Sequence, residues 1–212
     1  MATLLDIKNF VADLIGTGDG TTSVPKRDRI INSARRKFYS EKKWSFLKKT
    51  ATLNFTDNEA DLSADASDYN YKFDPISICT YSSNIKFQFT KVEWDDLTAY
   101  GTSDYVYAID KAGKKIKIST GDTTTSIEYI YLPADKTVGT SDDTDEEPVG
   151  DITAIGLLSL SMWYLGSRQS MAKYQLFKDE YKEELTRLLL LDEHAIRRFR
   201  YTSNDRRGYR RR

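Results

Sequence analysis

Few residues in this chain could carry out nucleophilic or acid–base chemistry. There is one histidine, His194, and one cysteine, Cys79. His194 follows an expected helix, where an imidazole can interact with the last backbone carbonyls, and no Cys or second His stands near it to complete a metal site. Cys79 lies in an apolar run, which favours a small buried side chain over a nucleophile. A Ser-His-Asp triad would have to use the one histidine beside a basic tail, so we expect that the protein is not an enzyme.

Two other patterns could bind a phosphate or a metal ion, but neither has the required spacing. Gly16, Gly18 and Gly20 follow a helical pattern instead of a strand, and no Lys-Ser or Lys-Thr pair closes a phosphate-binding loop. They are typical of a linker. An acidic run resembles a calcium loop only in charge, because it lacks the loop glycine and the alternating ligands. Its members are Asp142, Asp143, Asp145, Glu146 and Glu147. We therefore expect no cofactor and no metal, and interpret the run as a solvated loop or as a loop that meets a basic helix of a neighbouring copy.

The charges of the chain are segregated, although 32 basic and 32 acidic residues give no net charge. Residues 26–49 carry ten Lys or Arg against two acids. Separate blocks of opposite sign suit a subunit that meets copies of itself or partners through complementary faces. Together with the acidic run, the basic candidates for subunit contacts or for the lining of a DNA channel are Arg27, Arg29, Arg35, Arg36, Lys37, Lys42 and Lys43.

The last twenty residues combine arginine with aromatic side chains. Every basic residue here is Arg, whose guanidinium forms bidentate contacts, and this favours specific docking on a protein surface. Phosphate contacts and base stacking on nucleic acid are a second interpretation, and a solvated disordered tail is a third. The docking candidates are Arg197, Arg198, Phe199, Arg200, Tyr201, Arg206, Arg207, Tyr209, Arg210, Arg211 and Arg212.

Cysteine usage and hydropathy indicate the compartment. A single cysteine excludes an intramolecular disulfide framework and fits a reducing environment. No apolar run approaches the ~20 residues that span a bilayer. Residues 1–15 lack the basic start of a signal peptide. We expect a soluble protein made in a cytoplasm, without a membrane partner.

Apolar periodicity predicts helices at both ends of the chain. Residues 4–15 and 171–192 carry stripes with spacings of three and four, and residues 152–166 are apolar on much of their surface. A basic helix is expected to begin near Ser23, a suitable N-cap, with Pro25 in its first turn.

Between the helices the period changes to two. Gly113 is expected to be free to take a positive φ in a tight hairpin turn after Asp110, residues 94–97 suggest one helical turn, and residues 57–70 read as an acidic loop. The runs rich in β-branched and aromatic residues predict strands at 50–56, 76–81, 85–90, 105–110, 114–119 and 126–132.

This order predicts an α+β fold: a small helical bundle from the N- and C-terminal helices, with an inserted antiparallel β domain and an extended C-terminal tail. The expected boundaries are 1–48 for the N-terminal helices, 49–133 for the β domain, 134–150 for the acidic loop, 151–192 for the C-terminal helices and 193–212 for the docking tail.

Three passages together point to a known family. Residues 29–39 read RIINSARRKFY and lead into KWSFL at 43–47. YAID and KIKI flank the hairpin turn, followed by YIYLP and the acidic stretch. Pro148 precedes the C-terminal helices, the second of which contains FKDEYKEEL. In these passages the chain resembles the head–tail adaptor proteins of tailed bacteriophages, also called head-completion or connector proteins, which include the tail tubular proteins of short-tailed phages.

The resemblance implies a structural virion protein in the neck between capsid and tail, made in the cytoplasm of the bacterial host. Such proteins form a ring, usually of twelve copies, beneath the portal protein. The ring extends the channel for genomic DNA, which passes without sequence-specific recognition, and offers a surface to the downstream tail or nozzle protein. In several members the C-terminal segment grips the portal, which here would be the arginine-rich tail.

A nucleic-acid-binding module is the alternative. It would use the basic helix within residues 26–49 and the arginine-rich tail for phosphate contacts. The absence of net charge counts against it, because a dedicated binder is usually basic overall.

Overall fold

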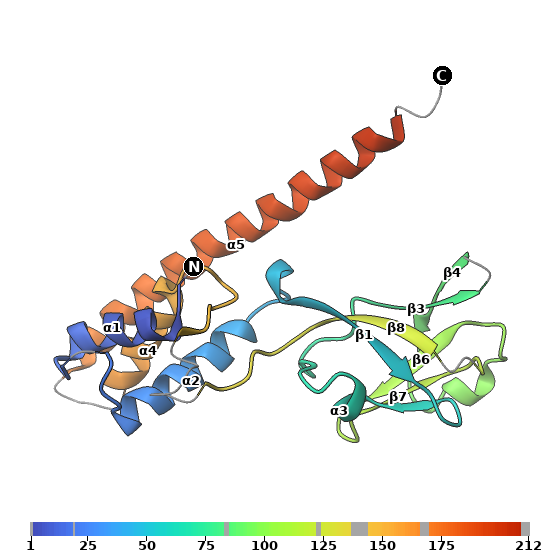
Figure 1. Ribbon diagram of the computed structural model, residues 1–212, viewed down its shortest axis with the longest axis horizontal. Helices are drawn as coiled ribbons and strands as arrows, with labels where there is room; N and C mark the ends of the chain where they lie inside the picture. Colours follow the sequence, from blue (N-terminus) through green and yellow to red (C-terminus); the bar gives the residue numbers. More distant parts are fainter. Residues whose placement is uncertain are drawn as a thin grey trace. The chain divides into compact units, whose positions relative to one another are not determined.

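The computed structural model describes residues 2–18, 20–82, 85–121, 124–136, 144–165 and 170–208, with only the course of the backbone for residues 194–208. The chain divides into two compact units, which we call the helical unit (Met1–Phe46 and Asp135–Arg212) and the β unit (Leu47–Ala134). Figure 1 shows the helices of both chain ends in one unit and the strands in the other. The predicted α+β class is confirmed.

Helix α4 (Thr153–Tyr164) is the centre of the helical unit, and it contacts α1 (Leu4–Ile15), α2 (Pro25–Tyr39) and α5 (Met171–Gly208). Its residues 154–161 are all buried. Gly156 allows the close approach of α1, since a Cβ at this position would lie 2.4 Å from Cδ1 of Phe10. The nearly continuous apolar character that the sequence shows here is therefore explained by neighbours on several sides.

The two N-terminal helices begin in different ways. Helix α1 has a capping box, in which the Asp6 N–H donates to Thr3 Oγ1 (3.3 Å) and the Thr3 N–H donates to Asp6 Oδ2 (2.8 Å). Helix α2 has Pro25 in its first turn, as expected, but its N-cap residue is Val24. The Ser23 hydroxyl donates to the Asp28 carboxylate (2.9 Å) instead of capping the backbone.

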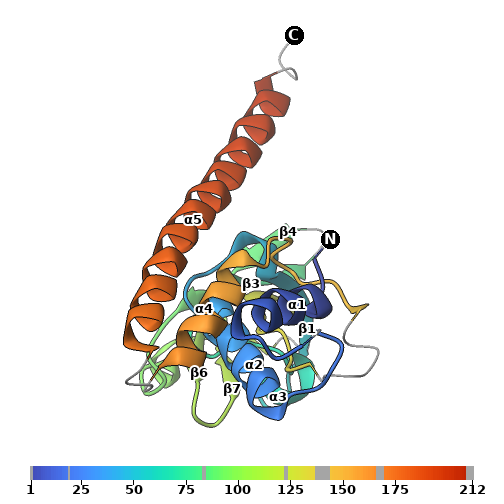
Figure 2. The ribbon, with the colours of Figure 1, turned by 90° about the vertical axis from the view of Figure 1, so that its left-hand side faces the viewer.

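Helix α5 is longer than the sequence pattern suggested. Its apolar stripe fades at Asp192, but the helix continues to Gly208. No glycine or proline stands between residues 171 and 207, so nothing in the sequence stops the helix earlier, and Gly208 is a usual C-terminal signal. Figure 2 shows α5 running past the other helices of its unit.

The β unit contains two four-stranded sheets. The first has the order β1 (Lys48–Asn54), β8 (Thr124–Ile130), β3 (Ser77–Ser82), β4 (Ile85–Gln88), and all its pairs are antiparallel. The second has the order β2 (Glu59–Asp61), β7 (Lys115–Ile118), β6 (Val106–Asp110), β5 (Thr90–Lys91), with one parallel pair, β5–β6.

One apolar core joins both sheets of this unit. Leu53, Ile78 and Ile127 from the first sheet and Ile116 and Ile118 from the second belong to a single buried cluster. In register, Ile78 faces Ile127 across β3 and β8, while Ile109 faces Ile116 across β6 and β7. The alternation seen in the sequence therefore corresponds to the inner faces of two packed sheets.

Two local predictions in the β unit need correction. The segment 57–70 is not only a loop, because it contains β2 and the single-turn helix α3 (Leu62–Asp65). In the β6–β7 turn the left-handed residue is Lys114 (φ 56°), not Gly113. Gly113 is needed for another reason: Asp110 Oδ1 accepts its N–H (3.0 Å), and a Cβ would lie 2.3 Å from Asp110 Oδ2.

Candidate assembly surfaces

The first part of α5 is fixed to the helical unit by a few buried side chains. Tyr181 and Leu188 are buried, and Asp192 is the last buried residue of the helix whose side chain is described. The Asp192 carboxylate accepts the Ser45 N–H (3.1 Å) and the Ser45 hydroxyl, and it lies 3.7 Å from the Lys42 ammonium. Asp192 therefore ties α5 to the segment that follows α2.

The outer side of α5 exposes leucines. Leu176, Leu190 and Leu191 are 53%, 55% and 52% exposed. The sequence offers a signal for this that the stripe analysis missed: four consecutive leucines at 188–191 cover most of the helix circumference, so at least one of them must face solvent. Exposed leucines of this kind on a helix suit a partner surface better than solvent.

The docking candidates divide between the helix and the end of the chain. Tyr209, Arg210, Arg211 and Arg212 lie outside the described residues. The others, Arg197, Arg198, Phe199, Arg200, Tyr201, Arg206 and Arg207, lie on the α5 backbone beyond Asp192.

The basic residues of and around α2 have different environments. Arg27 and Arg35 are 0% and 1% exposed. Arg27 Nε lies 3.1 Å from the Asp28 carboxylate, and its guanidinium also donates to the Thr22 carbonyl. Arg36 pairs with Asp135 (3.3 Å) at the surface, and Lys42 pairs with Asp192. Arg29, Lys37 and Lys43 are exposed.

Glu147 is the acidic centre of a buried polar network. Its carboxylate lies 3.0 Å from Arg35 Nε and 3.3 Å from Lys136 Nζ, and it accepts the Tyr39 hydroxyl at 2.7 Å. Burial, together with the adjacent Glu147 charge, raises the pKa of Tyr39 above its usual value. Asn32 closes the network by donating its side-chain amide to the Lys136 carbonyl (2.9 Å).

This network changes the role expected for the acidic run. Glu147 meets the basic helix, but the helix belongs to the same chain and both charges are buried, so Arg35 and Glu147 are not available to a neighbouring copy in this structure. Asp145 and Glu146 are exposed, and Asp142 and Asp143 lie outside the described residues. The sequence did not predict Tyr39 and Lys136 as partners of Glu147, because neither their residue types nor their spacing indicates such a contact.

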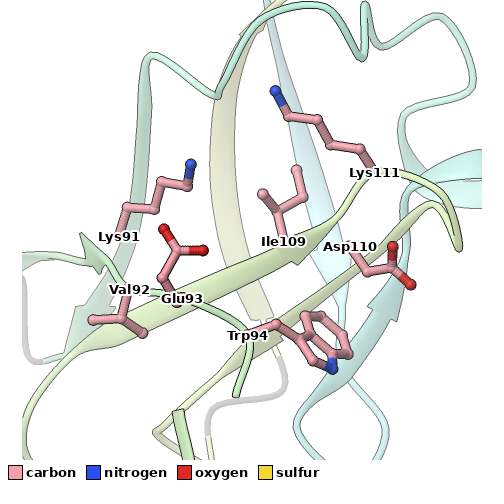
Figure 3. Close-up of a pocket in the computed structure, with 7 residues that line it drawn as sticks. All are labelled: Lys91, Val92, Glu93, Trp94, Ile109, Asp110 and Lys111. Carbon is pink, nitrogen blue, oxygen red and sulfur yellow. The ribbon is translucent and has the colours of Figure 1, made fainter. Parts of the chain in front are cut away.

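The β unit has a pocket of about 410 Å³, shown in Figure 3. Lys91 and Lys111 on its rim each lie 3.1 Å from the Asp74 carboxylate. Burial alone would raise the pKa of Asp74, but these two ammonium groups hold it below its usual value. The remaining lining residues are Val92, Glu93, Trp94, Ile109 and Asp110.

The candidate nucleophile and the candidate base from the sequence are Cys79 and His194. Cys79 is a buried free thiol on β3, and the side chain of His194 lies outside the described part of the chain. Within the described ranges, no three His, Cys, Asp or Glu residues come together as metal ligands. None of the described helices combines the length and the apolar character that crossing a membrane requires.

An edge hairpin of the β unit adds an exposed apolar end. Tyr81 on β3 and Ile85 on β4 are 62% and 59% exposed. Strand β4 is the last strand of its sheet, so its outer edge has no partner strand among the described strands. Large apolar side chains beside a free strand edge are typical of contact surfaces.

Comparison with known proteins identifies the family of the chain. A search of curated proteins finds no match to the chain. The family model described as SU10 adaptor protein matches residues 2–208, nearly the whole length. The chain therefore belongs to the SU10 adaptor protein family, and it is a structural adaptor of the bacteriophage virion.

Proposed function

We propose that copies of this chain form an oligomeric adaptor ring between the portal and the tail, and that residues 193–212 dock on the portal protein. The ring extends the channel through which genomic DNA passes, without sequence-specific contacts, and presents its other side to the downstream tail or nozzle protein. Membership of the SU10 adaptor protein family supports the adaptor role. The ring of about twelve copies follows from the resemblance to head–tail adaptors.

The observation that carries the docking proposal is the course of α5. Helix α5 continues from its last described buried side chain, Asp192, to Gly208, beyond the other helices of its unit (Figure 2). A helical segment of this length is marginal in water when nothing packs against it. Its arginine and aromatic composition favours a protein groove with carboxylates and apolar pockets as the partner that stabilises it.

The exposed leucines extend the same argument toward the helical unit. Leu190 and Leu191 lie directly before the docking segment. A partner that binds residues 193–208 along the helix would therefore also cover these two side chains. Their burial would add an apolar contribution to a contact that is otherwise largely charged.

A dedicated nucleic-acid-binding role has less support than the adaptor role. Arg27 and Arg35 are buried and paired within the chain, so the basic surface expected for α2 is smaller than its composition suggests. The remaining exposed basic residues suit weak contact with passing DNA.

A truncation after Glu193 tests the docking proposal. The shortened chain keeps every described buried side chain, so we expect an unchanged melting temperature. Mixed with the portal protein of the same phage, it should no longer be seen on the portal in negative-stain images. Portal binding equal to that of the full chain would contradict the proposal.

A second variant separates specific docking from simple charge attraction. Replacing Arg197, Arg198 and Arg200 by Lys keeps the charge and removes the guanidinium fork. We expect weaker portal binding with unchanged affinity for DNA. Unchanged portal binding would show that charge alone is sufficient.

A further inference from the structure

A second pocket of the protein lies in the helical unit, between α2, α4 and α5, and the adaptor role does not explain it. Its volume is about 210 Å³. Small-molecule sites are usually larger, roughly 300–1,000 Å³, so this pocket is closer to the size of one or two protein side chains. It is lined by Lys37, Leu158, Ser161, Met162, Leu165, Tyr174, Lys178, Tyr181 and Lys182.

The pocket combines an apolar floor with a basic rim. Leu165 is 60% exposed, although it is a large apolar residue. Of the three lysines, Lys182 lies 3.1 Å from the Asp179 carboxylate, whereas Lys37 and Lys178 form no ion pair with the described residues. Lys178 Nζ lies 5.3 Å from the centroid of the Tyr174 ring. Beside exposed apolar surface, two lysines therefore have no ion pair with the described part of the chain.

An unused polar atom also lines the pocket. Tyr181 is 6% exposed, and its hydroxyl forms no hydrogen bond within the described part of the chain. A buried hydroxyl without a partner is costly, and a ligand that accepts its proton would remove that cost. Burial, and after it the negative charge of Glu41, raises the pKa of the Tyr181 hydroxyl, so that the group stays protonated and able to donate. A ligand with a carboxylate attached to an apolar group matches this pocket. Its apolar group would contact the floor, and its carboxylate would meet the lysines of the rim and the Tyr181 hydroxyl.

The β unit offers a segment with this chemistry. Glu93, Asp95 and Asp96 are exposed and form no ion pair with the described residues, whereas Glu59, Asp68 and Asp74 of the same unit are all paired with lysines. Two aromatic rings accompany the three free carboxylates: Trp94, partly exposed at the edge of the pocket in Figure 3, and Tyr100, 43% exposed.

The other exposed apolar feature of the β unit fits less well. Tyr81 and Ile85 at the β3–β4 hairpin are next to Lys86, which is exposed. Docking of this hairpin would bring Lys86 to the lysine rim of the pocket, and like charges at a contact are unfavourable.

We propose that the lysine-rimmed pocket of the helical unit receives the acidic aromatic segment 93–100 from a second copy of the chain. The two surfaces are different, so the contact is heterologous, and a heterologous contact repeated around an axis produces a ring. The inference thus rests on the proposed ring and names a contact that would build it.

Disulfide trapping between two single-cysteine variants tests this contact. Lys178→Cys and Asp95→Cys, each with Cys79→Ser, are mixed and oxidised, alone at high concentration and on the portal. Matched controls are Glu180→Cys on the exposed side of α5 and Thr52→Cys on the exposed side of β1. We expect the Asp95→Cys/Lys178→Cys heterodimer to exceed each control pair by about fivefold or more, because a specific contact raises the effective concentration of the two thiols. Equal yields would overturn the proposal.

Charge reversal gives a second readout that does not depend on cysteine reactivity. Lys37→Glu/Lys178→Glu in one copy and Asp95→Lys/Asp96→Lys in the other should each reduce self-association when mixed with the unmodified chain. The two variants mixed together should restore it. If rings form on the portal but the Asp95→Cys/Lys178→Cys pair cross-links only as much as the controls, the proposed contact of segment 93–100 is wrong, while the proposed ring is supported. If the cross-link forms but no ring assembles on the portal, the contact stands and the proposed function fails.

Discussion

Two arginine-rich regions of this chain lie on different parts of the helical unit. In α2, Arg27 and Arg35 are buried and each lies about 3 Å from a carboxylate of the same chain. In the C-terminal part of α5, the arginines lie on a helix that extends past the other helices of its unit. Composition alone made both regions candidates for contact with partners. The comparison teaches that arginine-rich composition alone does not identify an interface, because Arg27 and Arg35 are paired inside their own chain.

The largest expected effect comes from breaking the buried network of α2. Glu147→Gln leaves the Arg35 charge buried without a carboxylate, which costs about 3–5 kcal/mol of unfolding free energy. Asp135→Asn is the matched control, because its pair with Arg36 is about half exposed and contributes under ~1 kcal/mol. Urea denaturation of both variants measures the difference. Equal losses would show that burial does not separate the two pairs.

The next largest effect is the difference in stability loss between a buried and an exposed leucine of α5. Leu188→Ala removes a buried side chain and should cost about 2–4 kcal/mol, whereas Leu191→Ala removes an exposed one and should cost under ~0.5 kcal/mol. The order reverses for portal binding, which we expect only Leu191→Ala to weaken without unfolding the chain. Thermal melts and portal pull-downs report the two properties. A large loss of stability in Leu191→Ala would place that residue in the core.

A smaller effect concerns alkaline pH. The pKa of Tyr39 is raised by burial and by Glu147, so the folded state holds this proton after the unfolded state has released it near pH 10. The contribution of this proton to the free energy of unfolding is complete below pH 10. It is lost as the pH rises above 10, by up to about 1.4 kcal/mol per pH unit. Tyr39→Phe should reduce this slope. Urea denaturation between pH 8 and 11 measures it, and an unchanged slope would contradict the assignment.

The smallest effect is expected with DNA. If the tail neutralises about six phosphates, log K should fall with log salt at a slope near −5 for duplex DNA, whatever the sequence. Truncation after Glu193 should remove most of this weak affinity, because α2 has part of its charge buried. Filter binding measures both chains. A truncated chain with the full salt slope would make α2 the main DNA contact.

Periodicity was sufficient to predict the order of the longer elements. The stripe of α1, the apolar α4 and the alternation in β7 and β8 follow from burial on one or more faces, which is a local property of sequence. Short elements such as β2, β5 and α3 are held by their neighbours and leave no periodic pattern. The burial of Arg35 depends on Glu147, 112 positions away, and no local rule reports such a pairing.

The end of α5 was misjudged for a related reason. The apolar stripe ends near Asp192, the last described buried side chain of α5, and this fading predicted the end of the helix. Backbone propensity continues to Gly208, because no residue before it breaks a helix. Of the candidate site, composition singled out the tail for which we propose docking, but only the structure shows that its backbone continues a packed helix.

Hydrogen–deuterium exchange of residues 193–208 tests the central claim most directly. In the free chain we expect these amides to exchange quickly, because an isolated helical segment of this length is marginal in water, while those of residues 174–188 should be protected. On the portal, residues 193–208 should become protected, together with the amides around Leu190 and Leu191. Equal exchange of 193–208 in the free and portal-bound chain would contradict docking through α5.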